Sequence, residues 1–270
     1  ANMGYVVLVT GASSGLGKSI AFHLHNLGHT VYGTSRDPKK YTEDFPFSLL
    51  PLDVTDAASI EALLIELEKK ETKIDVLINN AGVGITGPVE ETSLDAIRAN
   101  FETNFFGPLA MIQGVLPLMR KNNNGIIINI TSIAGYMGLP FRGAYSASKG
   151  ALNIISEALR LEIAAQGIRL MTLAPGDYAT DIAARRFHAP VIEGSPYQKA
   201  YQESLDTMDS HVDGGNDPIE IALTVAELIH LKKPRPHYLV GPLLQKFSLT
   251  LKKILPQKAY EKLLKNHYKL

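Results

Sequence analysis

The sequence contains no cysteine and no tryptophan, and its charges balance, with 27 Lys and Arg against 27 Asp and Glu. The absence of cysteine excludes disulfides, thiol nucleophiles and thiolate metal ligands, and it favours a cytoplasmic location. No apolar run approaches the roughly 18–20 residues of a membrane-spanning helix, and no signal-peptide pattern opens the chain. The eight histidines lack metal-ligand spacing, so we expect no metal site.

The balanced total hides an uneven distribution of charge. Residues 1–231 carry 17 Lys and Arg against 26 Asp and Glu, whereas residues 232–270 carry 10 against the single Glu261. This pattern predicts an acidic body with a basic C-terminal end. No RNA- or DNA-binding motif accompanies the basic end, so we expect no nucleic-acid partner.

Short β-branched runs alternate with longer amphipathic stretches along most of the chain. Such alternation is typical of parallel strands joined by crossover helices, and near-continuous apolar runs suit strands covered on both faces. We expect strands at residues 5–10, 30–35, 47–52, 74–79, 125–130, 168–173 and 237–240, and helices near 15–28, 56–72, 93–121, 143–166 and 217–232. The sequence therefore predicts an α/β doubly wound Rossmann fold: a seven-stranded parallel sheet with helices on both faces, in one domain over residues 1–270.

Two segments interrupt this alternation. Residues 176–215 contain glycines, prolines and scattered aromatics and are longer than a compact connection needs, which indicates a substrate lid. Residues 243–270 form a basic extension, helical over 243–268 with a break at Pro256.

The extension carries an apolar stripe beside seven lysines. The stripe comprises Leu243, Leu244, Phe247, Leu251, Ile254, Leu255, Tyr260, Leu263 and Leu264. Two interpretations are open: the stripe contacts an anionic membrane surface, or it packs on the body and leaves the lysines solvated.

A glycine-rich turn directly follows the first predicted strand and opens a helix, with the spacing G-x-x-x-G-x-G. Glycines here permit a tight turn and close approach of the backbone to a pyrophosphate, and the helix N-terminus supplies N–H groups and a positive dipole end. We therefore expect a dinucleotide to contact Gly11, Ser14, Gly15, Leu16 and Gly17.

The end of the second predicted strand bears on which dinucleotide is bound. An acidic residue there would bind the ribose 2′-hydroxyl and select NAD, but Ser35 and Arg36 occupy the position. Arg36 can pair with a 2′-phosphate. Asp37 follows, and we expect the turn into Pro38 to aim it elsewhere. The sequence therefore predicts NADP as the cofactor.

These and later motifs resemble the short-chain dehydrogenase/reductase family, in its single-domain branch. The matching elements are the glycine turn, Asp53-Val54, Asn79-Asn80-Ala81-Gly82, Asn104, Ser132, Tyr145-x-x-x-Lys149, and Pro175-Gly176 with Thr180, in the family's order over residues 5–180. The resemblance implies an oxidoreductase acting on an alcohol or its carbonyl. It also implies adenine contacts from Asp53 and Val54, a turn beneath the cofactor at Asn80, Ala81 and Gly82, and nicotinamide contacts from Pro175, Gly176 and Thr180.

Tyr145, Lys149, Ser132 and Asn104 are the predicted catalytic residues. Reduction of a ketone needs a proton on oxygen, and a free tyrosine, with a pKa of about 10, exchanges its proton reluctantly at neutral pH. Lys149 lies one helical turn from Tyr145, so its ammonium favours the phenolate, while Ser132 can hydrogen-bond the substrate oxygen. By resemblance, Lys149 also holds the nicotinamide ribose, and Asn104 interrupts its helix and supports a water-linked proton relay to Lys149. Each of the four residues alone has an ordinary structural explanation. The occurrence of all four at the family's positions favours a catalytic site.

The residues that would surround a substrate are largely apolar. Tyr178 and Phe187 in the lid, and Leu139 between Ser132 and Tyr145, can form walls around the reacting carbonyl, although core packing is the other interpretation. Met137 and Phe141 belong to the same candidate wall. We expect a bulky hydrophobic substrate that is steroid-, retinoid- or long-chain-like, and the chain resembles NADP-dependent hydroxysteroid and retinol dehydrogenases.

Three other functions are compatible with parts of the pattern. A non-catalytic NADP-binding or redox-sensing protein is disfavoured by the intact Tyr145-x-x-x-Lys149, and a 3-oxoacyl thioester reductase by the long C-terminal extension. An epimerase or dehydratase is disfavoured by the first glycine spacing. The family resemblance also implies a homodimer or homotetramer, assembled through the helices at 93–121 and 143–166.

Overall fold

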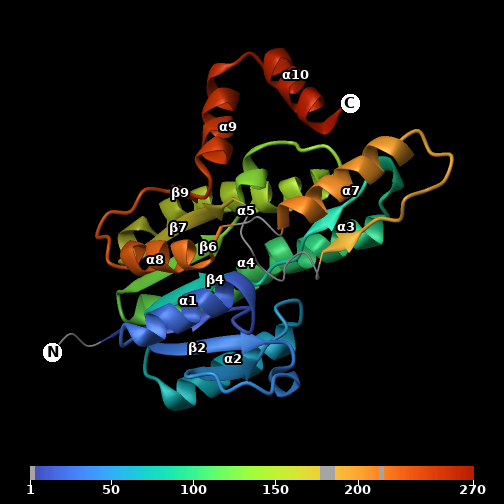
Figure 1. The fold of residues 1–270 in the computed structure, drawn as a ribbon. Coiled ribbons are helices and arrows are strands. Elements are labelled where there is room, and N and C mark those ends of the chain that lie inside the picture. Colours follow the sequence, from blue (N-terminus) through green and yellow to red (C-terminus); the bar gives the residue numbers. More distant parts are fainter. Residues whose placement is uncertain (1–3, 177–185, 213–215) are drawn as a thin grey trace.

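Seven parallel strands form the central sheet, in the order β3-β2-β1-β4-β6-β7-β9 (Figure 1). The computed structural model describes residues 4–176, 186–212 and 216–270, with the backbone alone for 210–212. The strands are β1 (Val6–Val9), β2 (Thr30–Ser35), β3 (Ser48–Pro51), β4 (Val76–Asn79), β6 (Gly125–Ile130), β7 (Ile168–Pro175) and β9 (His237–Val240). Every pairing in this sheet is parallel, so the predicted seven-stranded Rossmann sheet is confirmed.

Helices cover both faces of the sheet because its central strands are apolar on both. Every residue of β1, β4 and β6 is buried, and alternate residues contribute to two separate core clusters. One cluster lies under α1 (Gly15–Asn26) and α8 (Ile219–Leu228). The other lies under α2 (Ala57–Lys70) and α4 (Gly107–Lys121), with α5 (Gly143–Glu162) packed beside β7.

The strand order reverses direction at the centre of the sheet. The chain runs outward from β1 to β2 and β3, then returns to place β4 on the other side of β1. In open α/β sheets, ligands bind outside the carboxyl ends of the strands at such a switch point. This topology places the candidate site where Gly11 follows β1 and Asn80 follows β4.

The stretch predicted as one helix at 93–121 is divided. It contains α3 (Leu94–Phe101), one π-helical turn at Glu102–Phe106, and then α4. Asn104 lies within the π turn and is fully buried. Single π turns inside helices are frequent at functional sites.

The segment expected to be an irregular lid contains regular structure. It holds β8 (Phe187–His188), which pairs with β5 (Ile85–Thr86), and α7 (Gln198–Val212). Sequence reasoning missed α7 because most of its residues are polar. Its Tyr201 is buried and donates to the carbonyl of Ala189 at 2.6 Å. Short 3-10 turns lie at Pro38–Lys40, Val89–Glu91, Ile133–Tyr136 and Ala164–Gln166.

Two helices follow the last strand and project beyond the sheet, α9 (Leu243–Ile254) and α10 (Gln257–Tyr268) (Figure 1). The predicted break falls between them at Pro256. Leu249 of α9 and Tyr260 of α10 are buried in a small third cluster with Ile133 and Met137. The C-terminal extension therefore packs on the segment that follows Ser132.

Candidate active site

The glycine turn after β1 has a backbone that favours glycine at all three of its glycines, and Gly15 has a φ of +57°. Gly11 adopts a φ of +64°, and a Cβ on Gly17 would lie 2.1 Å from the carbonyl oxygen of Gly11. Ser14 is the N-cap of α1, and its side chain makes no capping hydrogen bond. The N–H groups of the first turn of α1 therefore have no side-chain partner from the cap, which is the arrangement that binds phosphate at a helix N-terminus.

Thr10 and Asn80 fasten this turn to the end of β4. The side-chain amide of Asn80 donates to the carbonyls of Thr10 and Gly11, each at 3.1 Å. In return, the Thr10 hydroxyl oxygen accepts from the backbone N–H groups of Asn80 and Ala81 at 3.0 Å. These four hydrogen bonds fix the separation of the two loops at the switch point of the sheet.

A cavity of about 860 Å³ lies between these loops and the ends of β2 and β3. Most of the predicted cofactor residues line it, namely Gly11, Ser14, Gly15, Leu16, Ser35, Arg36, Asp53, Val54, Asn80, Ala81 and Gly82. Gly17 is not in the lining and instead permits the close approach of α1 to the turn. A cavity with uncapped helix N–H groups at one part and the Arg36 guanidinium at another fits a dinucleotide.

Lys40 and Tyr41 also line the cavity, and sequence reasoning missed both. Lys40 adds a second cation near Arg36, and Tyr41 accepts a hydrogen bond from Ser13 at 2.9 Å. Their positions depend on the 3-10 turn at Pro38–Lys40, which the sequence signals only through Pro38.

Asp37, which we expected the turn into Pro38 to aim elsewhere, is among the residues that line the cavity together with Arg36. The 3-10 turn begins at Pro38, one residue after Asp37, so Asp37 stays beside the end of β2. An acidic group therefore stands close to the two cations at the end of β2.

Asp53 lies beyond the end of β3 and is held in place by the loop that follows. One carboxylate oxygen accepts from the N–H and hydroxyl of Thr55, at 2.9 and 2.7 Å. These hydrogen bonds, helped by Arg36, lower the pKa of Asp53. The N-cap of α2 is Asp56, which accepts from Ala58 at 3.0 Å, so capping does not account for Asp53.

Tyr145 and Lys149 lie one turn apart on α5. Lys149 is 5% exposed, and its ammonium donates to the carbonyl of Ile130 at 3.2 Å. Burial lowers the pKa of Lys149, and the nearby Tyr145 partly offsets that effect. A Cβ on Gly82 would lie 3.2 Å from the Lys149 nitrogen, so the lysine approaches the loop after β4 closely at a residue without a side chain.

Asn104 clamps the loop after β4. Its Oδ1 accepts from the N–H of Val83 at 2.8 Å, and its Nδ2 donates to the Val83 carbonyl at 2.8 Å. Asn100 donates to the same carbonyl at 3.0 Å. Ser148 lies 3.2 Å from Asn104 and donates to the carbonyl of Tyr145 at 2.9 Å. Asn100 and Ser148 thus connect the loop to α5, and no local motif indicates either.

Ser132 begins the 3-10 turn after β6, and its Oγ accepts from the N–H of Ala134 at 3.1 Å. That bond uses the oxygen as acceptor and leaves the hydroxyl proton available to a further acceptor. On the other side of the site, the Arg142 guanidinium lies 5.2 Å from the centre of the Tyr145 ring, a cation–π distance. Sequence reasoning did not single out Arg142.

The predicted substrate residues lie in different surroundings. Leu139 packs at the edge of the third cluster, and Phe187 is 46% exposed on β8. Phe141, from the same candidate wall as Leu139, is buried with its ring 5.5 Å from Tyr201, and Met137 packs against Tyr260. Met137 and Phe141 thus both pack against the body, and Phe141 also lines a second cavity.

The remaining predicted residues lie at the end of β7 or outside the described part of the chain. Pro175 is the last residue of β7, and the N–H of Gly176 donates to the carbonyl of Val240 at 2.8 Å. Tyr178 and Thr180 lie outside the described residues.

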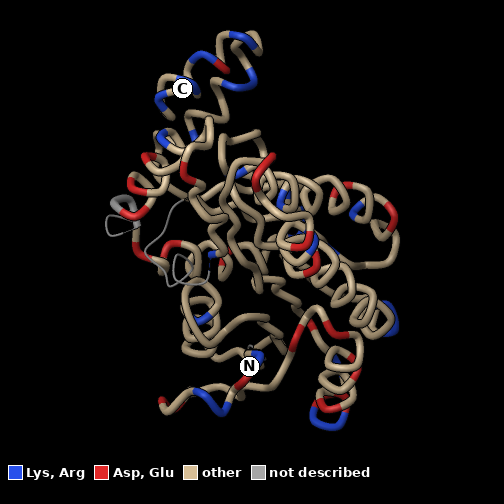
Figure 2. The backbone as a smooth tube through the Cα atoms, turned by 90° about the vertical axis from the view of Figure 1, so that its right-hand side faces the viewer, with Lys and Arg blue, Asp and Glu red and all other residues tan. Residues whose placement is uncertain are grey.

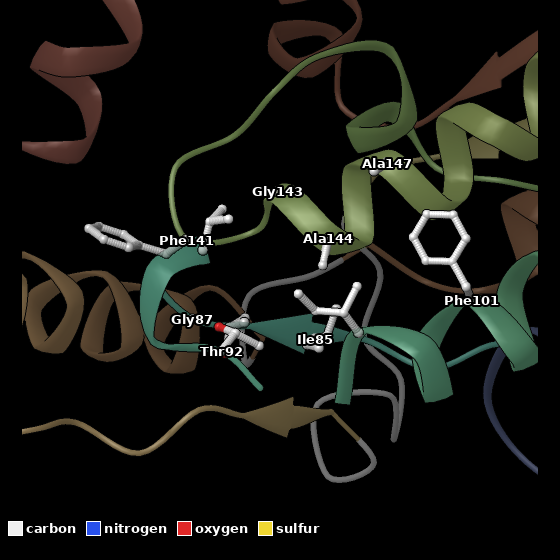
Figure 3. Close-up of a pocket in the computed structure, with 11 residues that line it drawn as sticks. Ile85, Gly87, Thr92, Phe101, Phe141, Gly143, Ala144 and Ala147 are labelled. Carbon is white, nitrogen blue, oxygen red and sulfur yellow. The ribbon is translucent and has the colours of Figure 1, made fainter. Parts of the chain in front are cut away.

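A second, smaller cavity of about 280 Å³ lies between β5, α3 and the start of α5 (Figure 3). Phe141, Phe101, Ala144 and Ala147 are among its lining residues. Its lining is mainly apolar and does not include Tyr145 or Lys149.

Comparison with known proteins identifies the chain. The family model described as short chain dehydrogenase matches residues 5–190. The chain is 36% identical over 264 residues to a 3-ketodihydrosphingosine reductase from Bacteroides thetaiotaomicron, with 97% of each chain covered.

Two solved structures are similar over nearly the whole chain. A short-chain dehydrogenase from Streptomyces avermitilis matches with a TM-score of 0.78 and 30% identity, over 94% of this chain and 96% of that one. A short chain dehydrogenase from Burkholderia cenocepacia in complex with NADP matches with a TM-score of 0.71 and 25% identity, over 97% of each chain. The chain therefore belongs to the short-chain dehydrogenase/reductase family, and it is an oxidoreductase with a nicotinamide cofactor.

Proposed function

We propose that this protein is an NADP(H)-dependent oxidoreductase that moves a hydride between nicotinamide and an alcohol or its carbonyl, with a bulky lipophilic ketone as the substrate reduced. The observation that carries the proposal is the placement of Lys149. Its buried ammonium lies one turn from Tyr145 and against Gly82 of the cofactor loop. One cation can therefore serve both the acid and the cofactor.

The residues around the larger cavity would hold the cofactor, which supplies or accepts the hydride when bound. The glycine turn and the N-terminus of α1 would bind the pyrophosphate. Asp53 and Val54 would face the adenine, and Lys149 would hold the nicotinamide ribose. Pro175, Gly176 and Thr180 would flank the nicotinamide, as the family resemblance implies.

Tyr145 would deliver the proton to the carbonyl oxygen as the alcohol forms. The free hydroxyl proton of Ser132 would donate to the same oxygen and stabilise the charge that grows there. Asn104 would hold the Val83 loop and support the water-linked relay that returns a proton by way of Lys149. In the oxidative direction Tyr145 would take the proton from the alcohol.

The preference for NADP rests on charge at the end of β2. Arg36 and Lys40 can both pair with a 2′-phosphate, whereas Asp37 would repel it and favour a 2′-hydroxyl. Two cations against one carboxylate favour NADP. A ratio of kcat/KM for NADPH over NADH above one supports this choice, and a ratio below one contradicts it.

Two observations support the proposed substrate class: the activity of a similar protein and the apolar residues near the site. A 3-ketodihydrosphingosine reductase that is 36% identical over 97% of both chains supports a long-chain ketone among the lipophilic candidates. Leu139, Phe187 and Tyr178 would contact its hydrocarbon part. Sequence identity at this level leaves room for a different substrate on the same fold, so steroid and retinoid carbonyls stay in the test.

A panel assay of NADPH oxidation tests the function. The panel contains short polar ketones, a 3-oxoacyl thioester, a retinoid aldehyde, a 3-keto steroid and a long-chain 3-keto amine. We expect turnover to concentrate on the lipophilic members. Turnover of the thioester alone would assign a 3-oxoacyl thioester reductase, and NADPH binding without any turnover would favour a non-catalytic sensor.

The assembly is a separate part of the proposal. Phe106, beside the start of α4, and Ile154 and Leu161 of α5 are exposed apolar side chains, and they support a homodimer or homotetramer formed through these helices. Sedimentation equilibrium gives the mass directly. The single domain over residues 1–270, the lid at 176–215 and the cytoplasmic location also stay predictions.

A further inference from the structure

The first helix of the C-terminal extension has two apolar faces. Leu249 is 5% exposed and packs on the body. Leu243, Phe247 and Ile254 lie on the opposite side, at intervals of four and seven residues, and are 81%, 54% and 72% exposed. Leu244, 79% exposed, borders them. The prediction of a stripe packed on the body thus holds for part of the stripe, and a second part faces outward.

This outward face, defined by Leu243, Leu244, Phe247 and Ile254, is called the α9 stripe. The four side chains make no apolar cluster with any other described part of the chain. Four large apolar side chains along about three turns of one helix are more than the scattered exposed leucines of an ordinary surface. The α9 stripe therefore indicates a binding surface.

The segment that carries the α9 stripe is rich in lysine. Residues 243–270 contain seven lysines and one acidic side chain, Glu261. Figure 2 shows that the charged positions of the C-terminal helices are mainly blue, the colour of Lys and Arg, at the end of the molecule away from the N-terminus. Within the described ranges none of these lysines forms a salt bridge, although Lys252 donates to the carbonyl of Tyr136.

The charge decides which kind of surface fits. A symmetric contact between two copies would bring two sets of lysines together, and their repulsion opposes it. An anionic lipid surface accepts both features, because its headgroups attract lysines and its acyl boundary takes leucine and phenylalanine side chains. Among the described residues no helix is long and apolar enough to cross a bilayer, so the contact would lie in the interface plane.

We propose that α9 and α10 dock this protein on an anionic lipid bilayer through the α9 stripe and its lysines. The opposite, packed side of α9 adjoins the active site: a Cβ on Gly176 would lie 2.1 Å from the Gln245 side chain, and Lys252 donates to the 3-10 turn that begins after Ser132. Docking through the α9 stripe places the substrate side of the site near the bilayer. That consequence rests on the proposed lipophilic substrate, whereas the docking itself does not.

Vesicle flotation with the full chain tests the docking. One vesicle population contains equal parts phosphatidylcholine and phosphatidylglycerol, and the other contains phosphatidylcholine alone. We expect the chain to float with the anionic vesicles and to stay behind with the neutral ones. Absence of flotation with the anionic vesicles overturns the proposal.

Paired variants locate the contact. Leu244→Ser with Phe247→Ser should lower the affinity for anionic vesicles by about tenfold or more. The matched control, Leu27→Ser with Leu223→Ser, changes two exposed leucines outside the extension and should bind as the wild type does. Equal binding by both variants overturns the assignment to α9.

Charge variants separate lipid attraction from apolar contact. Lys253→Glu with Lys262→Glu should abolish flotation at physiological salt, whereas Lys69→Glu with Lys121→Glu should leave it in place. Sedimentation without lipid tests whether a second copy of this chain covers the α9 stripe instead. If the wild type forms an assembly that the Leu244/Phe247 variant does not form, the α9 stripe is a subunit interface and the proposal fails. Flotation needs no turnover, so an inactive chain that floats would refute only the proposed function.

Discussion

The candidate active site and the C-terminal extension differ in what they bury: the site buries polar side chains, whereas the extension exposes apolar ones. In the candidate active site, Thr10 and Asn104 are buried and hydrogen-bonded to the backbone of the loop after β4, and Lys149 is buried and donates to a carbonyl at the end of β6. In α9, Leu243 and Leu244 are almost fully exposed. A preorganised polar network suits one small, highly charged ligand, whereas an open apolar surface suits a broad partner. We infer from this difference that the buried residues of the active site determine the chemistry, whereas the C-terminal extension determines which surface the protein approaches.

Lys149→Met removes the buried cation of the active site, and we expect it to have the largest effect. Loss of the cation should lower turnover by about 10²- to 10⁴-fold, because Tyr145 and the cofactor both depend on it. Stability should stay equal or rise, since burial lowers the pKa of Lys149 and so disfavours its charged form. Steady-state kinetics and thermal unfolding measure the two effects, with the exposed Lys121→Met as control. A large loss of stability would assign Lys149 a structural role instead.

Asn104→Ala tests whether the buried network is as rigid as its contacts indicate. The N–H and carbonyl of Val83 both lose their Asn104 partner, so we expect a loss of about 2–3 kcal/mol of unfolding free energy together with reduced turnover. Urea unfolding measures the loss. Asn122→Ala, which removes an exposed hydrogen bond to Leu118, should cost about 0.5 kcal/mol or less. Equal losses in both variants would contradict the clamp.

Arg36→Ala sharpens the account of cofactor choice. We expect kcat/KM with NADPH to fall about tenfold to a hundredfold, the loss of one charge-assisted pair, while the value with NADH changes little. Asp37→Asn should move the ratio in the opposite direction, because it removes the carboxylate that favours the 2′-hydroxyl. Equal effects on both cofactors would show that Arg36 does not face the 2′ position.

Tyr32 gives the smallest effect, and it depends on pH. Burial and the hydrogen bond to Glu71 raise the pKa of Tyr32 to about 12. Unfolded tyrosine loses its proton at about pH 10, so above that pH the folded state retains more protons and stability falls between about pH 10 and 12. Tyr32→Phe should flatten that decline. Unfolding curves across this range check it, and an unchanged slope would be the contrary result.

The parts of the site that lie in local motifs could be predicted from the sequence. Gly11 and Gly17 are needed by the backbone of their own turn, and Tyr145 and Lys149 belong to one helix. These features are set by residues a few positions apart, which a linear reading can see.

Residues that join the site by tertiary contact could not be predicted. Ser148 meets Asn104 across the contact with α5, and Asn100, one turn before Asn104, joins the site through the distant Val83 carbonyl. The position of Asp37 in the cavity lining depends on where the 3-10 turn begins, at the residue after it. The sequence likewise identified the apolar stripe of the extension but could not divide it, since that depends on where α9 packs.

Comparison of the wild type with Tyr145→Phe tests the central claim most directly. NADPH oxidation is measured with a long-chain ketone, and NADPH binding is measured separately by fluorescence. The account predicts rapid oxidation by the wild type and a loss of about 10²- to 10⁴-fold in the variant, with binding intact in both. A variant that oxidises NADPH within a few-fold of the wild type would contradict the assignment of Tyr145 as the proton donor.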